Sequence, residues 1–187
     1  MSEQLTAERI IALLGLKPHP TCGFVAEIYR TQERIPDEAL PTAYAGSRPL
    51  ASVLYFMVTA DAQIRLHRIR SDQMYHHYLG EPLEVLLLYP DGIGEIKIIG
   101  ADLAAGMRPQ LLIPGGTFHM SRLRNTSART GFALLGTTEW PGFESPDLEL
   151  ADPTKLIAAY PTLRREIEAF TKTQARIVTE QPEENCL

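Results

Sequence analysis

Residues 67–80, HRIRSDQMYHHYLG, and residues 106–119, GMRPQLLIPGGTFH, decide how this chain folds. Each stretch combines short apolar runs of strand length with turn residues, and together they carry four of the five histidines. A polar ring inside such a segment needs a polar partner, because burying it alone is costly. We therefore expect the two stretches to meet as the two halves of one pocket.

Short runs rich in β-branched and aromatic residues continue on both sides of these stretches. They are separated by turn residues such as Asp91-Gly92 and Pro114-Gly115-Gly116. Many short strands between such turns are typical of an all-β barrel or sandwich. The expected strands are residues 24–29, 51–58, 64–69, 74–79, 83–89, 95–99, 110–113 and 132–138.

Helices are expected only near the ends of the chain. Thr6 can cap a short amphipathic helix that Gly15 ends. A second helical segment follows Asp152, with Pro153 in its first turn and a new start at Thr162. The predicted organisation is a helix in residues 1–15, a β-barrel domain in 16–150, a helical segment in 151–175 and a flexible tail in 176–187.

The composition is that of a globular protein with a core of its own. The 187 residues are 44% hydrophobic and 22% charged, with a formal net charge of −5. Basic residues never run together beyond Arg164-Arg165, which argues against a nucleic-acid partner. No apolar run approaches the roughly 20 residues that span a bilayer, and no secretion signal is recognisable. We expect a cytoplasmic protein with two free thiols, Cys22 and Cys186.

A turn at residues 70–72 would bring His67 and Gln73 together. On one straight strand these residues would be about 20 Å apart. If the chain folds back at Arg70-Ser71-Asp72, positions 67 and 73 pair across an antiparallel ladder, with Cβ atoms about 5 Å apart. His119, three residues after Gly116, would supply a third group to the same site.

The first stretch resembles the first motif of the cupin family. That motif has a leading glycine, two histidines separated by one residue, a glutamate and a closing glycine. In this chain Asp61, His67, Ile69, Gln73 and Gly80 hold those positions. The spacing is kept, while the leading glycine, the second histidine and the glutamate are replaced.

The second stretch matches the second cupin motif, Pro-x-Gly-x-x-His, at Pro114, Gly116 and His119. From residue 16 to residue 150 the chain is similar to the cupin branch called DUF985 or cupin-5. The matching pieces include LKPHP at 16–20, HR at 67–68, RPQ at 108–110 and PGF at 141–143. The resemblance implies a double-stranded β-helix, or jelly-roll, barrel with a cavity open at one end, commonly a homodimer.

Three functions remain open for such a cavity. The family is similar to the dTDP-sugar 3,5-epimerases, which implies metal-free proton transfer on a small carbonyl-containing or sugar-like metabolite. The alternatives are a metal-dependent, oxygenase-like cupin enzyme and a non-catalytic small-ligand-binding protein. We prefer the metal-free enzyme, because Ile69 cannot bind a metal and Gln73 is a weak ligand.

The candidate residues follow from these functions. An imidazole can act as a general base near neutral pH, with a tyrosine as the acid. The arginines would hold an anionic part of the ligand, and a carboxylate would orient the histidine. The catalytic candidates are His67, His76 and Tyr78; the ligand-binding candidates are Arg30, Tyr55, Arg68, Gln73, Tyr75, Arg108, His119 and Asp147, with Glu149 as a second orienting carboxylate; the metal candidates are His67, Gln73 and His119.

Overall fold

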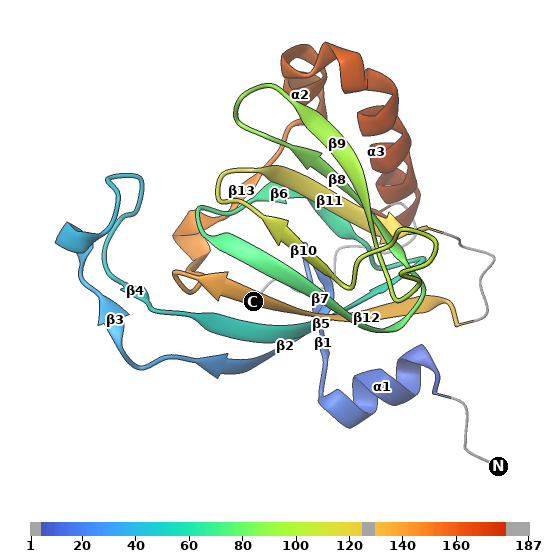
Figure 1. Cartoon of the computed structure of the whole chain (residues 1–187), viewed down its shortest axis with the longest axis horizontal. Helices are drawn as coiled ribbons and strands as arrows, with labels where there is room; N and C mark the ends of the chain where they lie inside the picture. Colours follow the sequence, from blue (N-terminus) through green and yellow to red (C-terminus); the bar gives the residue numbers. More distant parts are fainter. Residues whose placement is uncertain (1–4, 125–129, 179–187) are drawn as a thin grey trace.

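The computed structural model describes residues 5–124 and 130–178 and contains two β-sheets that face each other (Figure 1). The six-stranded sheet has the order β1-β2-β5-β12-β7-β10, and the five-stranded sheet has the order β13-β6-β11-β8-β9. Neighbouring strands in both sheets are antiparallel. This architecture confirms the expected all-β jelly-roll barrel with a short N-terminal helix and C-terminal helices.

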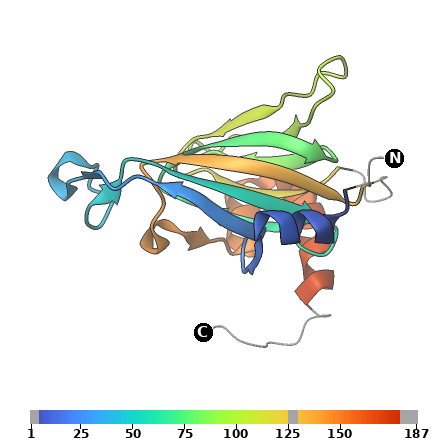
Figure 2. The same cartoon turned by 90° about the horizontal axis from the view of Figure 1, so that it is seen from below.

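The strands have the following bounds. The six-stranded sheet contains β1 (Lys17–His19), β2 (Gly23–Arg30), β5 (Ser52–Thr59), β12 (Phe132–Trp140), β7 (Asp72–Gly80) and β10 (Gln110–Ile113). The five-stranded sheet contains β13 (Glu149–Leu150), β6 (Ile64–Arg68), β11 (Phe118–Leu123), β8 (Leu83–Leu88) and β9 (Gly94–Ile99). A separate pair, β3 (Arg34–Ile35) and β4 (Arg48–Pro49), forms an arm that extends beyond the barrel in both views (Figures 1 and 2).

The main core lies between the two sheets. Successive side chains of a strand point to opposite faces, so alternate residues of each strand enter this space. Fully buried examples from both sheets are Phe56, Ile64, Val85, Leu87 and Leu135. Removal of this apolar surface from water is the principal term that holds the two sheets together.

A short helix, α1 (Ala7–Leu14), packs on the outer face of the six-stranded sheet. It begins as predicted, because the Thr6 side chain accepts a hydrogen bond from the amide of Arg9. It ends at Gly15, whose φ of 62° is left-handed and favours glycine. Ile10 is buried against Met57 and neighbouring residues of the sheet.

The helices α2 (Pro153–Ala159) and α3 (Arg164–Val178) cover the outer face of the five-stranded sheet. The helix start predicted at Thr162 is displaced, because residues 161–163 form a 3-10 turn before α3. Residues 176–178 of the predicted tail belong to α3. Residues 179–187, with Cys186, lie outside the described part. Cys22 is a free thiol. Within the described ranges, no helix is long and apolar enough to cross a membrane.

The predicted hairpin between His67 and Gln73 is wrong. β6 and β7 belong to different sheets, so His67 pairs with His119 in one sheet and Gln73 pairs with Glu139 in the other. The connection crosses between the sheets at Ile69, which is buried and whose carbonyl accepts a hydrogen bond from the Gly116 amide. The two side chains still line one cavity, because both strands turn the relevant face toward the barrel interior.

Candidate functional site

One part of the barrel interior is left open as a cavity of about 290 Å³. This volume is at the lower end of the range for small-molecule sites, which is about 300–1,000 Å³. Its walls come from both sheets and from the segment after β12. About half of the lining side chains are apolar, and the polar ones include His67, Gln73, Tyr75, Thr137 and Glu139.

Two cross-strand pairs supply the polar groups on the six-stranded sheet. Gln73 of β7 is opposite Glu139 of β12, and Tyr75 is opposite Thr137. Side chains paired in this way have Cβ atoms about 5 Å apart. The Thr137 hydroxyl is buried and has no hydrogen-bond partner among the described residues. This wall therefore offers an amide, a carboxyl, a phenol and a hydroxyl within one small area.

His67 enters the cavity from the five-stranded sheet because β6 is bulged. His119 pairs with His67 but Ser121 pairs with Ile64, so one residue of β11 opposes two of β6. The extra residue lets both Ile64 and His67 face inward. The Nδ1 atom of His67 is 2.7 Å from the Arg65 carbonyl oxygen. A carbonyl only accepts, so Nδ1 carries the proton and Nε2 is left as an acceptor facing the cavity.

His119 lies between His67 and Tyr75. Its ring centre is 4.3 Å from that of His67 and 5.9 Å from that of Tyr75. Its Nδ1 donates to the Thr117 carbonyl at 3.3 Å, and its Nε2 accepts from the Tyr75 hydroxyl at 3.0 Å. Both nitrogens of His119 are thus engaged, while His67 keeps one nitrogen for a ligand.

Burial keeps these three groups neutral. It lowers the pKa of His67 to about 4, although the hydrogen bond to Arg65 acts in the opposite direction. Burial, with the neighbouring His67, lowers the pKa of His119 well below its usual value. Burial also raises the pKa of Tyr75 well above 10. At pH 7 the site contains two neutral imidazoles and a neutral phenol.

Glu139 is a further polar residue of the cavity, and the sequence analysis missed it. It is almost fully buried, and Ser52 Oγ donates a 2.6 Å hydrogen bond to its Oε2. Burial raises the pKa of this carboxyl. A signal was present in the sequence, since Leu135, Thr137 and Glu139 alternate along β12 and share its inward face.

Three predicted residues lie on the opposite face of the six-stranded sheet. The rings of Tyr55 and Tyr78 are 5.9 Å apart and line a separate apolar hollow of about 300 Å³ beside α1. His76 stacks on Tyr78, and its Nε2 is 3.3 Å from the Thr138 hydroxyl. Because Tyr75 points inward, its neighbour His76 points outward. The structure therefore does not bring His76, Tyr55 or Tyr78 together with His67.

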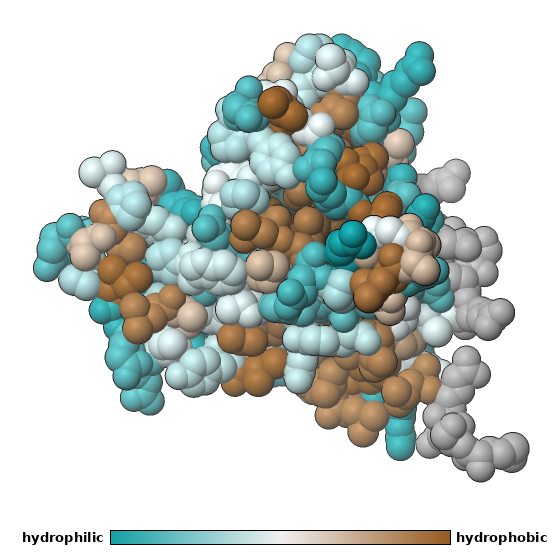
Figure 3. Space-filling model, in the orientation of Figure 1, coloured by the Kyte–Doolittle hydropathy of each residue, from teal (hydrophilic) through white to brown (hydrophobic). Residues whose placement is uncertain are grey.

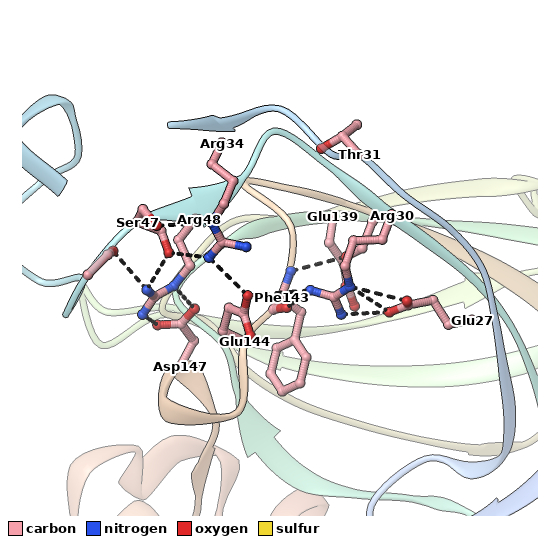
Figure 4. Close-up of polar contacts among 12 residues, drawn as sticks. Glu27, Arg30, Thr31, Arg34, Ser47, Arg48, Glu139, Phe143, Glu144 and Asp147 are labelled. Carbon is pink, nitrogen blue, oxygen red and sulfur yellow. Dashed lines mark hydrogen bonds and ion pairs between the residues drawn. The ribbon is translucent and has the colours of Figure 1, made fainter. Parts of the chain in front are cut away.

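The predicted arginines do not line the cavity. Arg30 lies near its mouth and donates to the Phe143 carbonyl at 2.8 Å (Figure 4). Arg68 is paired with Glu149 at 2.6 Å, and Arg108 donates to the Met107 carbonyl. Arg30 and Arg68 link separate segments of the chain, whereas the bond of Arg108 is to the carbonyl of the preceding residue.

Asp147 is committed to a buried ion pair. Its two carboxylate oxygens accept from Arg48 at 2.7 and 2.8 Å (Figure 4). The carboxylates of Asp147 and Glu149 are therefore bonded to arginines, and the Arg65 carbonyl orients His67. Asp147 lines a wider cleft of about 620 Å³, which shares Ile69 and Leu148 with the cavity.

The residues at the metal positions do not fit a transition metal. Such an ion needs three or four nitrogen, oxygen or sulfur ligands. His119 has both nitrogens in hydrogen bonds, Ile69 has no donor atom, and Gln73 is a neutral amide. Within the described part of the chain, no three His, Cys, Asp or Glu side chains gather as a metal site.

The fold defines a jelly-roll barrel with an internal cavity. Residues 8–151 match the family described as Cupin superfamily (DUF985), and the chain belongs to this family.

Two solved structures show the same fold. A hypothetical protein from Leishmania major is 25% identical with a TM-score of 0.79, and protein SO0799 from Shewanella oneidensis is 31% identical with a TM-score of 0.74. Each comparison covers 89% of this chain and 98% of the other. The uncharacterized protein YML079W from Saccharomyces cerevisiae is 28% identical over 102 residues, which are 54% of this chain. The chain spans 50% of that relative's length. The descriptions of these three proteins name no activity.

Proposed function

We propose that the barrel cavity binds a small carbonyl-containing or sugar-like metabolite and that the protein moves a proton at the carbon next to the carbonyl, as an isomerase or epimerase does. One observation carries this proposal. His67 presents an unprotonated Nε2 to an enclosed cavity, while the Arg65 carbonyl holds the other side of the ring. The geometry is that of a fixed, neutral general base.

The proposed step needs no cofactor. The C–H bond next to the carbonyl breaks, its electron pair moves into the enolate, and the proton goes to His67 Nε2. The amide of Gln73, which lines the same cavity, can donate a hydrogen bond to the enolate oxygen. Burial disfavours the imidazolium form of His67, and the enolate beside it supplies the opposite charge.

Tyr75 is the proposed acid, because it lines the cavity and Tyr55 and Tyr78 do not. Its hydroxyl donates to His119, so this hydrogen bond must be exchanged for one to the ligand. Transfer of the Tyr75 proton to the opposite face of the enolate forms the new C–H bond and leaves a phenolate. The proton on His67 then returns to Tyr75 through solvent at the cavity mouth.

A non-catalytic receptacle is the second candidate. The pKa of His67 is about 4, and a base that weak accelerates proton transfer less than one with a pKa near 7. The same polar wall would then bind a ligand without changing it.

Deuterium exchange separates the two candidates. The protein is incubated in D₂O with a panel of pentoses and hexoses, and deuterium next to the carbonyl is followed by NMR. The proposal predicts exchange with at least one sugar, reduced at least about 100-fold in His67→Gln. His76→Gln, which changes a histidine on the outer face, should keep the wild-type rate. Binding without exchange would favour the receptacle, and equal rates in wild type and His67→Gln would refute the role of His67.

A further inference from the structure

We infer that the cavity selects an uncharged or positively charged ring-sized ligand bearing hydroxyl or amine groups, and that it rejects carboxylates and phosphates. Glu139 is the residue that makes this choice. The inference rests on the proposed function, since it concerns the ligand of the same cavity. It also replaces the expectation that arginines hold an anionic part of the ligand.

The charges on the cavity wall support this selection. Among the described residues that line it there is no lysine or arginine, and Glu139 supplies a carboxyl group. The neighbouring imidazole of His67 is neutral at pH 7. An anionic ligand would lose its hydration inside the cavity without gaining a cationic partner, which is strongly unfavourable.

The charged side chains near Phe143, which lines the cavity, also lack an excess of positive charge. Arg30 is held by Glu27 at 2.6 Å and lies 3.7 Å from Glu144. Arg34 also pairs with Glu144, at 3.2 Å (Figure 4). Arg30 and Arg34 thus lie among the carboxyl groups of Glu27 and Glu144, and Glu139 adds a third carboxyl on the cavity wall. The local charges therefore give an approaching anion no net attraction.

The polar wall has unused capacity for ligand hydrogen bonds. The Glu139 carboxyl accepts from Ser52 through Oε2, and the two oxygens of a carboxyl group offer further hydrogen-bonding positions. Thr137 lies two residues earlier on the same face, about 7 Å away along the strand. Its buried hydroxyl has no partner among the described residues. Two polar groups at this spacing can contact two substituents of one ring.

The remaining walls suit the apolar face of such a ring. Val25, Leu54, Phe56, Ile69 and Leu148 line the cavity around the polar groups. A saturated ring with hydroxyl substituents has CH groups that can pack on these side chains, while its hydroxyls reach Thr137 and Glu139. A neutral sugar or an amino sugar combines both properties and carries no negative charge.

Three probes with one ring scaffold test the inference: glucosamine, glucose and glucuronate, which are cationic, neutral and anionic at neutral pH. Their affinities for the full chain are measured by ligand-observed NMR. We expect glucosamine to bind at least about 10-fold more tightly than glucuronate, with glucose between them, a difference of about 1.4 kcal/mol.

The variant Glu139→Gln removes the carboxyl that can carry a negative charge and retains an oxygen that can accept from Ser52. It should bring glucosamine and glucuronate to similar affinities. Glu149→Gln, a control for an exposed carboxylate outside the cavity, should leave the wild-type preference unchanged. The inference is overturned if glucuronate binds as well as glucosamine, if the preference survives in Glu139→Gln, or if none of the three probes binds. A sugar that still exchanged its proton through His67 would leave the proposed function intact in any of these cases.

Discussion

His67 and His119 occupy directly opposed positions of β6 and β11, and their ring centres are 4.3 Å apart inside the barrel. The two residues are separated by about fifty positions in the sequence and come from the two cupin-like motifs. Both rings are buried, so protonation of either one would place a charge beside a second imidazole in a poorly solvated space. The pair is therefore stable only in its neutral form.

This pair predicts that the folded state weakens in mild acid. The pKa of His67 is about 4 in the folded chain and 6.5 as its ordinary value. Between these pH values the unfolded chain binds more protons, so the free energy of unfolding falls as the pH falls below 6.5. At pH 5 the loss from His67 alone is about 2 kcal/mol.

Urea denaturation at pH 7.5 and pH 5 measures this loss. His67→Gln should show a pH-dependent decrease smaller by about 2 kcal/mol than that of wild type. His76→Gln, on the outer face of the sheet, should behave like wild type. Identical pH dependence in wild type and His67→Gln would show that His67 titrates normally in the folded chain.

The buried Arg48–Asp147 ion pair should contribute much more to the free energy of unfolding than an exposed ion pair does. Both side chains are almost completely buried, and Asp147→Asn leaves the guanidinium without its carboxylate. We expect a loss of about 3 kcal/mol or more in the free energy of unfolding. Glu149→Gln, which breaks an exposed pair with Arg68, should cost less than about 1 kcal/mol. Equal effects on urea denaturation would contradict this interpretation.

The residues at the metal positions of the cupin motifs predict how metal ions affect the thermal stability of the protein. Millimolar Mn²⁺ or Zn²⁺ should leave the melting temperature of the wild type unchanged, because Ile69 and Gln73 stand where the family motif has histidine and glutamate. The double variant Ile69→His with Gln73→Glu restores those donors. It should gain about 3 kcal/mol when the free metal is about 100-fold above its Kd. A similar gain in the wild type would show that its own residues form a metal site.

The exposed apolar residues of the six-stranded sheet bear on the expected homodimer. Tyr29, Tyr78, Leu79, Leu112 and Trp140 are all exposed on its strands, and hydrophobic surface also gathers over α1 in Figure 3. We expect a mass twice the 20.8 kDa of the chain in light scattering. Leu112→Glu should give the monomer, and Leu103→Glu, in an exposed loop, should not. A wild-type mass of 20.8 kDa would contradict the dimer.

The fold was predictable because strand length, turn residues and cupin-like motifs agree with one another. β11 was missed as a strand, since its inward residues His119 and Ser121 are polar and hide the apolar alternation of Phe118 and Met120. The crossing at Ile69 was also missed. A turn and a crossover between sheets have the same local sequence signs, and only long-range packing distinguishes them.

The candidate site was only partly predictable. His67, Gln73, Tyr75 and His119 were predicted for one pocket from their motifs and strands; the first three line the cavity, and His119 lies behind them with its Nε2 bonded to Tyr75. The inward or outward face of a strand cannot be read from a histidine or tyrosine alone, so His76 and Tyr78 were included although they lie outside. Glu139 was missed because a carboxyl at a strand end usually faces solvent.

The state of the His67 ring tests the central claim most directly. Long-range ¹H–¹⁵N NMR of the imidazoles distinguishes the protonated ring and both neutral tautomers. We predict that His67 stays neutral at pH 6 and carries its proton on Nδ1, with Nε2 free for a ligand. A ring protonated with a pKa near 6.5, or a neutral ring with its proton on Nε2, would contradict the account.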